Sequence, residues 1–310
     1  MRKFSPTIPV LVIYHGNCAD GFTGAWAARY RLQNLTMPEL QVEYYAGTYQ
    51  DEPPECEGKD VVFIDFCYKL PVMQAIHQKA HSLTILDHHK SAMEDVWPWA
   101  ATAQDIAGNL DKLEAIFDME RSGARIAWDY FNPGMQPPKV LLHVEDRDLW
   151  RFALEGTREI QAAVFSHPYD FDTWDKIMKT STNHLRTEGV AIERKHFKDV
   201  NELLKVTQRW AVIDGKEVPV ANLPYTMTSD AGTAMCGDGI PFAACYWDTP
   251  DGRVFSLRSR GEDGADVSAI AKKYGGGGHK NASGFRVRYE QIIDNGKLMT
   301  VLDHPFGEGK

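Results

Sequence analysis

Residues 82–89 read SLTILDHH, an apolar run that ends in three polar side chains. The apolar part has the length and composition of a buried strand, whereas Asp87, His88 and His89 are costly to bury without partners. We therefore place the triplet at the end of a strand, where side chains stop packing and become available for chemistry. The next question is whether other strands of the chain end in the same way.

The first half of the chain alternates between strand-like and helix-like segments. This alternation predicts an α/β fold with a mostly parallel sheet and helices on both of its faces. In such sheets, ligand sites collect at the carboxyl ends of the strands. Strands are expected at 9–14, 42–46, 60–66 and 82–89, and helices at 21–32 and 71–81.

Three of these strands deliver acidic or imidazole groups to that edge, and an acidic cluster follows the apolar residues after position 139. Carboxylates combined with histidines suit hard or borderline divalent ions such as Mn²⁺ and Mg²⁺. Two such ions can clamp a phosphate and generate a hydroxide nucleophile. The candidate set is His15, Asp20, Asp65, Asp87, His88 and Asp146, with Asp65 as the natural bridging residue.

The second half of the chain contains a charged helical stretch and then a further set of short strands. Residues 275–285 read GGGGHKNASGF. Glycines permit close backbone approach, and successive N–H groups can form an anion-binding nest. The segment is therefore interpreted as a phosphate- or nucleotide-binding loop, and the alternative is a flexible turn. The expected domains are a catalytic domain at 1–180, a helical connector at 181–208 and a smaller α/β substrate-binding domain at 209–310 across a cleft.

The composition limits the classes of partner. The net charge is −9, which argues against coating long duplex nucleic acid through many phosphate contacts. Five cysteines without a CxxC pair indicate a reducing compartment, so the cytoplasm is expected. We expect no signal peptide and no membrane-spanning segment, because no apolar run approaches the length that a bilayer needs.

Four ordered motifs together resemble the DHH phosphoesterase superfamily with its associated C-terminal domain, over about residues 9–288. The motifs are the LDHH triplet, the lone Asp65, a first-strand motif that ends in Asp20-Gly21, and the distal GGGGH and ASGF. The resemblance implies a dinuclear, usually Mn²⁺, site. Relatives include single-strand exonucleases, hydrolases of short oligoribonucleotides and of pAp, cyclic dinucleotide phosphodiesterases and manganese pyrophosphatases.

The resemblance also implies roles for individual residues. Asp20 and Asp65 match metal ligands, and Asp65 is the bridging one. In the catalytic triplet Asp87, His88 and His89, His88 matches a ligand and His89 could face the phosphate. Asp146 matches the ligand of the fourth motif, with Asp148 in reserve. The substrate-binding residues implied in the second domain are Arg258, Arg260, Gly276, Gly277, Gly278, His279 and Ser283.

The first motif departs from the family pattern. Its usual Asp-x-Asp reads Cys18-Ala19-Asp20, so one metal position lacks its carboxylate. Cys18 could ligate as a thiolate, or His15 or Asn17 could fill the position. We therefore expect one or two Mn²⁺ ions per chain, with Mg²⁺ or another divalent ion as alternatives.

The leading hypothesis is a metal-dependent phosphodiesterase that acts on short single-stranded oligonucleotides or small nucleotide phosphates, as an oligoribonuclease does. The alternatives are a 5′ single-strand exonuclease, an exopolyphosphatase or pyrophosphatase, a cyclic nucleotide phosphodiesterase, and a nucleotide sensor without turnover. An exonuclease needs aromatic stacking platforms, for which Trp97 and Trp99 are candidates. Membranes and long duplexes are not expected partners. A homodimer is a possible oligomeric state.

Overall fold

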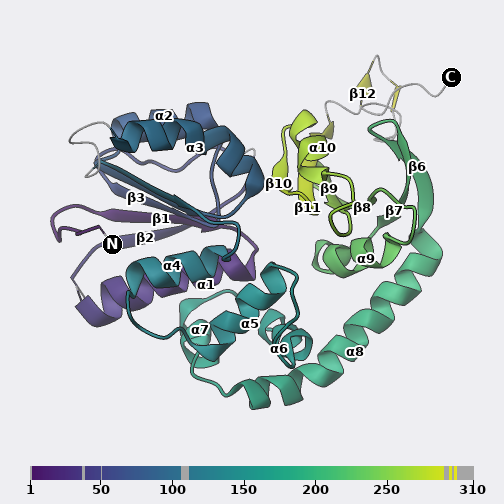
Figure 1. The fold of residues 1–310 in the computed structure, drawn as a ribbon, viewed down its shortest axis with the longest axis horizontal. Coiled ribbons are helices and arrows are strands. Elements are labelled where there is room, and N and C mark those ends of the chain that lie inside the picture. Colours follow the sequence, from purple (N-terminus) through teal and green to yellow (C-terminus); the bar gives the residue numbers. More distant parts are fainter. Residues whose placement is uncertain are drawn as a thin grey trace. The chain divides into compact units, whose positions relative to one another are not determined.

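The computed structural model describes residues 2–36, 39–49, 51–105, 112–289, 293–294 and 297–298 of the 310. The chain divides into two compact units, Met1–Glu193 and Arg194–Lys310, and each is described by itself (Figure 1).

A five-stranded parallel sheet forms the centre of the first unit, in the order β2-β1-β3-β4-β5. Its central strands β3 and β4 are buried along their whole length. This explains their nearly continuous apolar sequences, since a parallel sheet is covered on both faces. The strands are β1 (Val10–His15), β2 (Val42–Gly47), β3 (Asp60–Ile64), β4 (Ser82–Asp87) and β5 (Leu113–Phe117).

Helices cover both faces of this sheet. Side chains of α2 and α3 pack in one apolar core with the residues of β1, β3 and β4 that point to one face, while α1, α4, α5, α6 and α7 pack on the other (Figure 1). The helical elements are α1 (Ala19–Arg29), the π-helical turn η1 (Tyr30–Thr36), α2 (Leu70–Lys79), α3 (Lys90–Asp105), α4 (Gly123–Phe131), α5 (Lys139–Asp148), α6 (Thr157–Phe165), α7 (Phe171–Ile177) and α8 (Thr182–Thr207).

The second unit contains a six-stranded mixed sheet in the order β10-β11-β9-β8-β7-β6. Only the β7–β8 pair is parallel among the pairs of this sheet in the described residues. Helices α9 and α10 pack in two separate apolar cores. The elements are β6 (Arg209–Ile213), β7 (Lys216–Asn222), η2 (Tyr225–Met227), α9 (Thr228–Met235), β8 (Ala243–Thr249), β9 (Gly252–Arg258), α10 (Val267–Lys273), β10 (Gly277–His279), β11 (Ala282–Arg288), β12 (Ile293–Asp294) and β13 (Lys297–Leu298).

The predicted α/β class is confirmed, with a parallel sheet flanked by helices and a second sheet-containing unit. The predicted strands of the first half all form. β5 was not predicted, because its short sequence LEAIF follows a polar stretch without a clear strand boundary. In the part of the chain that the structure describes, no helix combines the length and apolar character needed to cross a bilayer.

Candidate metal centre

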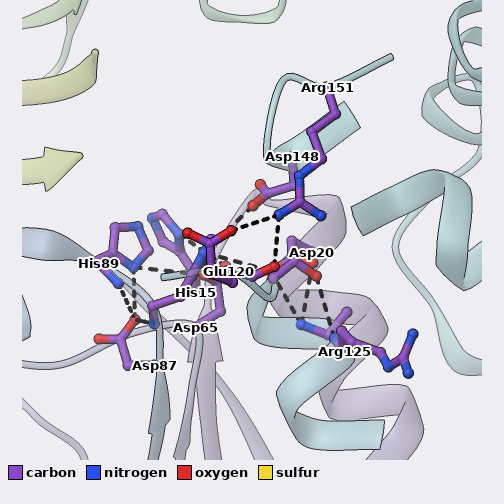
Figure 2. A network of polar contacts seen from close by, with 12 residues as sticks. His15, Asp20, Asp65, Asp87, His89, Glu120, Arg125, Asp148 and Arg151 are labelled. Atoms are coloured by element: carbon purple, nitrogen blue, oxygen red, sulfur yellow. Dashed lines mark hydrogen bonds and ion pairs between the residues drawn. The ribbon is translucent and has the colours of Figure 1, made fainter. Parts of the chain in front are cut away.

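Three parallel strands end at one edge of the first sheet, and the polar residues that follow them meet there (Figure 2). β1 ends at His15, β3 is followed by Asp65, and β4 ends at Asp87 with His88 and His89 directly after it. The convergence follows from the topology, because β1, β3 and β4 are neighbours and run in the same direction.

Asp65 lies at the centre of this group. It is 1% exposed, and its Oδ1 lies 3.0 Å from His88 Nε2 and 3.7 Å from His89 Nδ1. Its Oδ2 lies 3.4 Å from His15 Nδ1. One carboxylate therefore has histidines on two sides, which is the geometry expected of a residue shared between two cation positions.

The backbone of Asp65 adopts a left-handed conformation, with φ at 57°. This region is unfavourable for residues other than glycine, and such strain concentrates at functional sites. Gly123 at the start of α4 makes the conformation compatible with close packing, because a Cβ there would lie 2.4 Å from Asp65 Cβ. The same added atom would lie 2.9 Å from Asp20 Oδ2, so the absence of a side chain at Gly123 brings two carboxylates together.

Asp20 lies in the first turn of α1 and is 1% exposed. Both of its oxygens accept from the Ala124 N–H at 3.2 Å, at the N-terminus of α4. Its Oδ2 is 3.9 Å from His88 Nε2. Two helix N-termini thus face this carboxylate, and their dipoles favour its negative charge.

Asp87 holds the turn of the triplet rather than pointing toward the other carboxylates. Its Oδ1 accepts from the backbone N–H groups of His88 and His89 at 2.7 and 3.1 Å, and it lies 2.8 Å from His89 Nδ1. A carboxylate on one imidazole nitrogen fixes the tautomer and orients the other nitrogen. Asp87 is thereby an orienting residue for His89.

Asp146, which was expected to be the fourth-motif ligand, is not brought into the cluster by the structure. Its carboxylate accepts from the backbone N–H groups of Ala153 and Leu154 at 2.8 and 3.1 Å and from the Thr157 hydroxyl at 2.5 Å, which uses both oxygens. Asp148, the predicted reserve, takes its place beside the cluster, with Oδ2 3.4 Å from His88 Nε2. The two residues are two positions apart on α5 and so point to different sides of the helix.

The charges in the cluster shift its pKa values strongly. Burial and the negative charges of Asp148 and Asp65 raise the pKa of Asp20 well above its usual range. Burial also raises the pKa of Asp148. For Asp65, burial alone would raise the pKa, but the polar contacts with His15 and His88 lower it well below the usual range.

His88 shows the opposite balance. Burial disfavours its charged form, but the hydrogen bond to Asp65 and the charges of Asp148, Asp65 and Asp20 together raise its pKa to about 10. The cluster therefore attracts positive charge. Without a metal, protons supply this charge, on the imidazole of His88 and on the carboxyl groups of Asp20 and Asp148, whose pKa values are raised.

The donor atoms fit divalent ions. Among the described residues of the first unit, two triads have one ligand atom per residue, with the atoms of each triad within 4.8 Å of one another, and both triads contain Asp65. One adds Asp20 and His88, and the other adds His15 and His89. Oxygen and imidazole donors suit Mn²⁺ and related ions. Asp65 Oδ2 and His15 Nδ1 are buried without a hydrogen-bond partner, as expected for atoms that await a cation.

Cys18 precedes the first turn of α1 and lies close enough to Asp65, Asp148 and Asp20 for their charges to act on its thiol. Burial and these three carboxylates raise the pKa of the Cys18 thiol well above its ordinary value. Without a metal the thiol is therefore protonated. Ligation by Cys18 stays a prediction, since neither triad in the described residues includes its sulfur.

The predicted loop at 275–285 has a different structure from the one expected. The N–H groups of Gly275 and Gly276 donate to carbonyls of Lys272 and Ala271 at the end of α10. Gly277, Gly278 and His279 form β10, which pairs with β11. The expected nest of free N–H groups is therefore wrong for Gly275 and Gly276. A Cβ at Gly276 would lie 2.0 Å from Gly284 O, so close strand packing explains this glycine.

The other predicted substrate residues belong to β9, β10 and β11 of the second sheet or directly follow β9. Arg258 at the end of β9 donates to the hydroxyls of Ser229 and Ser256 at 2.7 and 3.0 Å. Arg260 is exposed two residues later, and the Ser283 hydroxyl donates to His279 O at 2.7 Å. Their role in binding a substrate stays a prediction.

Two functional candidates escaped the sequence reasoning. Gly123 was overlooked because a single glycine after Ser122 signals only a helix start, although Ser122 does cap α4 through the Arg125 N–H. Arg151 was overlooked because it follows the acidic cluster in an apparently irregular stretch. Its guanidinium donates to the Glu120 carbonyl (Figure 2).

Comparisons with known proteins agree with the architecture. No family model matches the chain. Uncharacterized protein R106 of Acanthamoeba polyphaga mimivirus is 29% identical over 319 residues, which cover 93% of this chain and 71% of that protein. A solved structure of a DHH domain, described as belonging to a family of ribosomal proteins, has a TM-score of 0.55 at 12% identity and covers 90% of this chain and 82% of its own.

The second of these similarities shows that the chain has the fold of a DHH-domain protein, which confirms the predicted resemblance at the level of fold. A pGpG-specific phosphodiesterase from Vibrio cholerae is also similar, with 14% identity over 92% of this chain and 94% of its own. The TM-score of that structure is 0.36.

Proposed function

We propose that this protein is a divalent-metal-dependent phosphohydrolase that cleaves phosphodiester bonds in short oligonucleotides or small nucleotide phosphates. The observation that supports this most directly is the shared position of Asp65. Its carboxylate belongs to both donor triads, one with Asp20 and His88 and one with His15 and His89. Pairs of divalent ions held in this way are suited to phosphoryl chemistry.

In this proposal Asp20, Asp65, His88 and Asp148 hold one ion, and Asp65, His15 and His89 contribute to a second. A divalent ion, when bound, would supply Lewis acidity and would lower the pKa of a coordinated water toward neutrality. The protein residues then orient the reacting groups. Asp87 fixes the ring of His89 through Nδ1, so that the other nitrogen of this ring would be available to the second ion.

The preference for short substrates is supported by charge and by the surroundings of the aromatic residues. A net charge of −9 disfavours a long polyanion. Trp97 and Trp99, the candidate stacking platforms of an exonuclease, are partly buried and pack against the core around α2 and α3. Aromatic rings held in this way offer little free face to a base, which favours the short-substrate hypothesis over the exonuclease.

The test combines metal content with turnover in one preparation. The protein is purified without chelator, its bound metals are counted, and Mn²⁺ is added with pAp, a ribodinucleotide, a 20-mer RNA and polyphosphate in parallel. We expect Mn²⁺-dependent release of mononucleotide from the two short substrates and slower turnover of the 20-mer. Equal processing of the 20-mer would favour the exonuclease, and phosphate release from polyphosphate alone would favour a phosphoanhydride hydrolase.

Metal bound without turnover of any of the four would contradict the proposal. The remaining hypotheses would then be a nucleotide sensor without turnover and a phosphodiesterase that acts on a cyclic nucleotide. The matched control is Asp65→Asn, which keeps the size of the side chain but removes the shared charge.

A further inference from the structure

The segment that follows α5 is strained in an unusual way. Trp150 and Phe152 both have left-handed backbones, with φ at 55° and 48°, and they flank Arg151. This conformation is unfavourable for bulky side chains and persists only where the surroundings impose it. Because such strain concentrates at functional sites, two strained residues on either side of Arg151 indicate that its position has a function.

Hydrogen bonds to Asp146 stabilise this backbone conformation. Its backbone carbonyl accepts from the N–H groups of Arg151 and Phe152 at 2.9 and 3.3 Å. Its carboxylate accepts from the next two N–H groups, those of Ala153 and Leu154. Four successive backbone donors thus converge on one buried aspartate. The carboxylate that was expected to bind a metal instead shapes the segment that carries Arg151.

The two aromatic rings are held as well. The rings of Trp150 and Phe152 contact each other edge to face, with centroids 5.0 Å apart. The Arg147 guanidinium lies 5.5 Å from the Trp150 ring and the Arg158 guanidinium lies 3.8 Å from the Phe152 ring. These cation–π contacts, made by arginines of α5 and α6, restrain the two rings. Both backbone and side chains therefore fix the position from which Arg151 extends.

Arg151 itself is partly exposed and is held by an easily displaced partner. Its side chain is 44% exposed, and its Nη2 donates to the Glu120 carbonyl at 2.8 Å. The Glu120 carboxylate, 3.4 Å away, is 87% exposed, so the ion pair is screened by water. Figure 2 shows Arg151 beside Asp148, reaching toward Glu120 at the edge of the carboxylate cluster.

We propose that Arg151 binds a phosphate of the substrate next to the one that is cleaved, and that Asp146 is a positioning residue for it. This inference rests on the proposed function of the carboxylate cluster. An anionic substrate is repelled by Asp20, Asp65 and Asp148, and a fixed guanidinium beside them offsets that repulsion. Its fork of N–H donors matches phosphate oxygens, which replace Glu120 as acceptors.

The test compares a substrate with two phosphates and one with a single phosphate, namely a 5′-phosphorylated ribodinucleotide and bis(p-nitrophenyl) phosphate, both with Mn²⁺. Arg151→Ala should raise KM for the dinucleotide by about tenfold to a hundredfold, with kcat changed less than about threefold. KM for the single-phosphate substrate should stay within about twofold. Glu120→Gln should lower KM for the dinucleotide slightly, because it removes a competing carboxylate.

The matched control is Arg186→Ala, which removes a partly exposed arginine paired with Glu155 elsewhere in the same unit. It should leave both KM values unchanged. Asp146→Asn should reproduce the KM effect of Arg151→Ala while the bound metal count stays that of the wild type. Loss of metal from Asp146→Asn would overturn its positioning role.

Equal KM values for wild type and Arg151→Ala on the dinucleotide would overturn the inference while the hydrolase proposal stands. If the wild-type protein hydrolyses neither substrate, the hydrolase proposal fails, and calorimetric binding of the same dinucleotide decides about Arg151. Weaker binding by Arg151→Ala supports the phosphate site, and equal binding rejects it.

Discussion

Binding of a divalent ion to the carboxylate cluster should release protons, and His88 determines most of the effect near neutral pH. Its pKa is raised to about 10, so it carries a proton at pH 7. A metal needs the neutral imidazole nitrogen. Removing a proton three pH units below a pKa costs about 4 kcal/mol, since each unit corresponds to ~1.4 kcal/mol. The apparent association constant for Mn²⁺ should therefore rise about tenfold per pH unit between pH 7 and 9.

The assay is isothermal titration calorimetry with Mn²⁺ in pairs of buffers that have the same pH but different ionisation enthalpies. At pH 7 we expect at least about one proton released per chain, with a further contribution from the raised carboxyl of Asp20. His88→Asn should lower the count by about one. The control is His167→Gln, a histidine paired with Glu188 outside the cluster. Binding without proton release, with a pH-independent association constant, would refute this reasoning.

The same shift predicts how the metal-free protein responds to pH. The folded-state pKa of His88 lies above its unfolded value of about 6.5, so its stabilising contribution is complete below pH 6.5 and is lost as the pH rises toward 10. The raised pKa of Asp20 acts in the same direction. Thermal unfolding in chelator should therefore show a midpoint that falls between pH 6.5 and 9, and added Mn²⁺ should reduce that fall. A midpoint that rises over this range in chelator would contradict the assignment.

Three substitutions test the cluster directly. Asp65→Asn should lower turnover by at least about a thousandfold and reduce the bound metal, measured by atomic absorption, and retained turnover would remove the shared-ligand role. Gly123→Ala should lower the free energy of unfolding by about 1–3 kcal/mol, because the added methyl group overpacks against Asp65, and it should also weaken Mn²⁺ binding. Urea unfolding and metal titration measure these two effects, and wild-type values in both would contradict the packing argument. Cys18→Asp should tighten Mn²⁺ binding but lower the unfolding midpoint in chelator, because a further carboxylate joins the cluster. Unchanged Mn²⁺ affinity would show that position 18 faces no ion.

The sequence predicted the edge of the sheet at which the site lies because that prediction needs only strand identity and direction. Apolar runs identify strands β1, β3 and β4, and a parallel arrangement brings their carboxyl ends together. His15, Asp65 and His88 follow from their positions at these ends. No knowledge of side-chain packing is needed for this step.

The sequence could not decide between Asp146 and Asp148, because that choice depends on helix rotation. Both lie in the last turn of α5, and only the packing of that helix determines which one faces His88. The left-handed backbones of Trp150 and Phe152 also cannot be predicted from residue propensities, since neither residue type favours that region. Strain of this kind arises from tertiary contacts.

In the family pattern that the sequence resembles, a carboxylate stands where this chain has Cys18. The Cys18 thiol has a raised pKa among three acidic neighbours. The position is not left without donors, because His15 and His89 both face Asp65. The donor set on that side therefore shifts from oxygen toward nitrogen, which favours borderline ions over Mg²⁺. Because the replaced carboxylate would restore an oxygen donor, Cys18→Asp should also shift the preference of that position back toward Mg²⁺, and a competition titration between Mg²⁺ and Mn²⁺ would measure it.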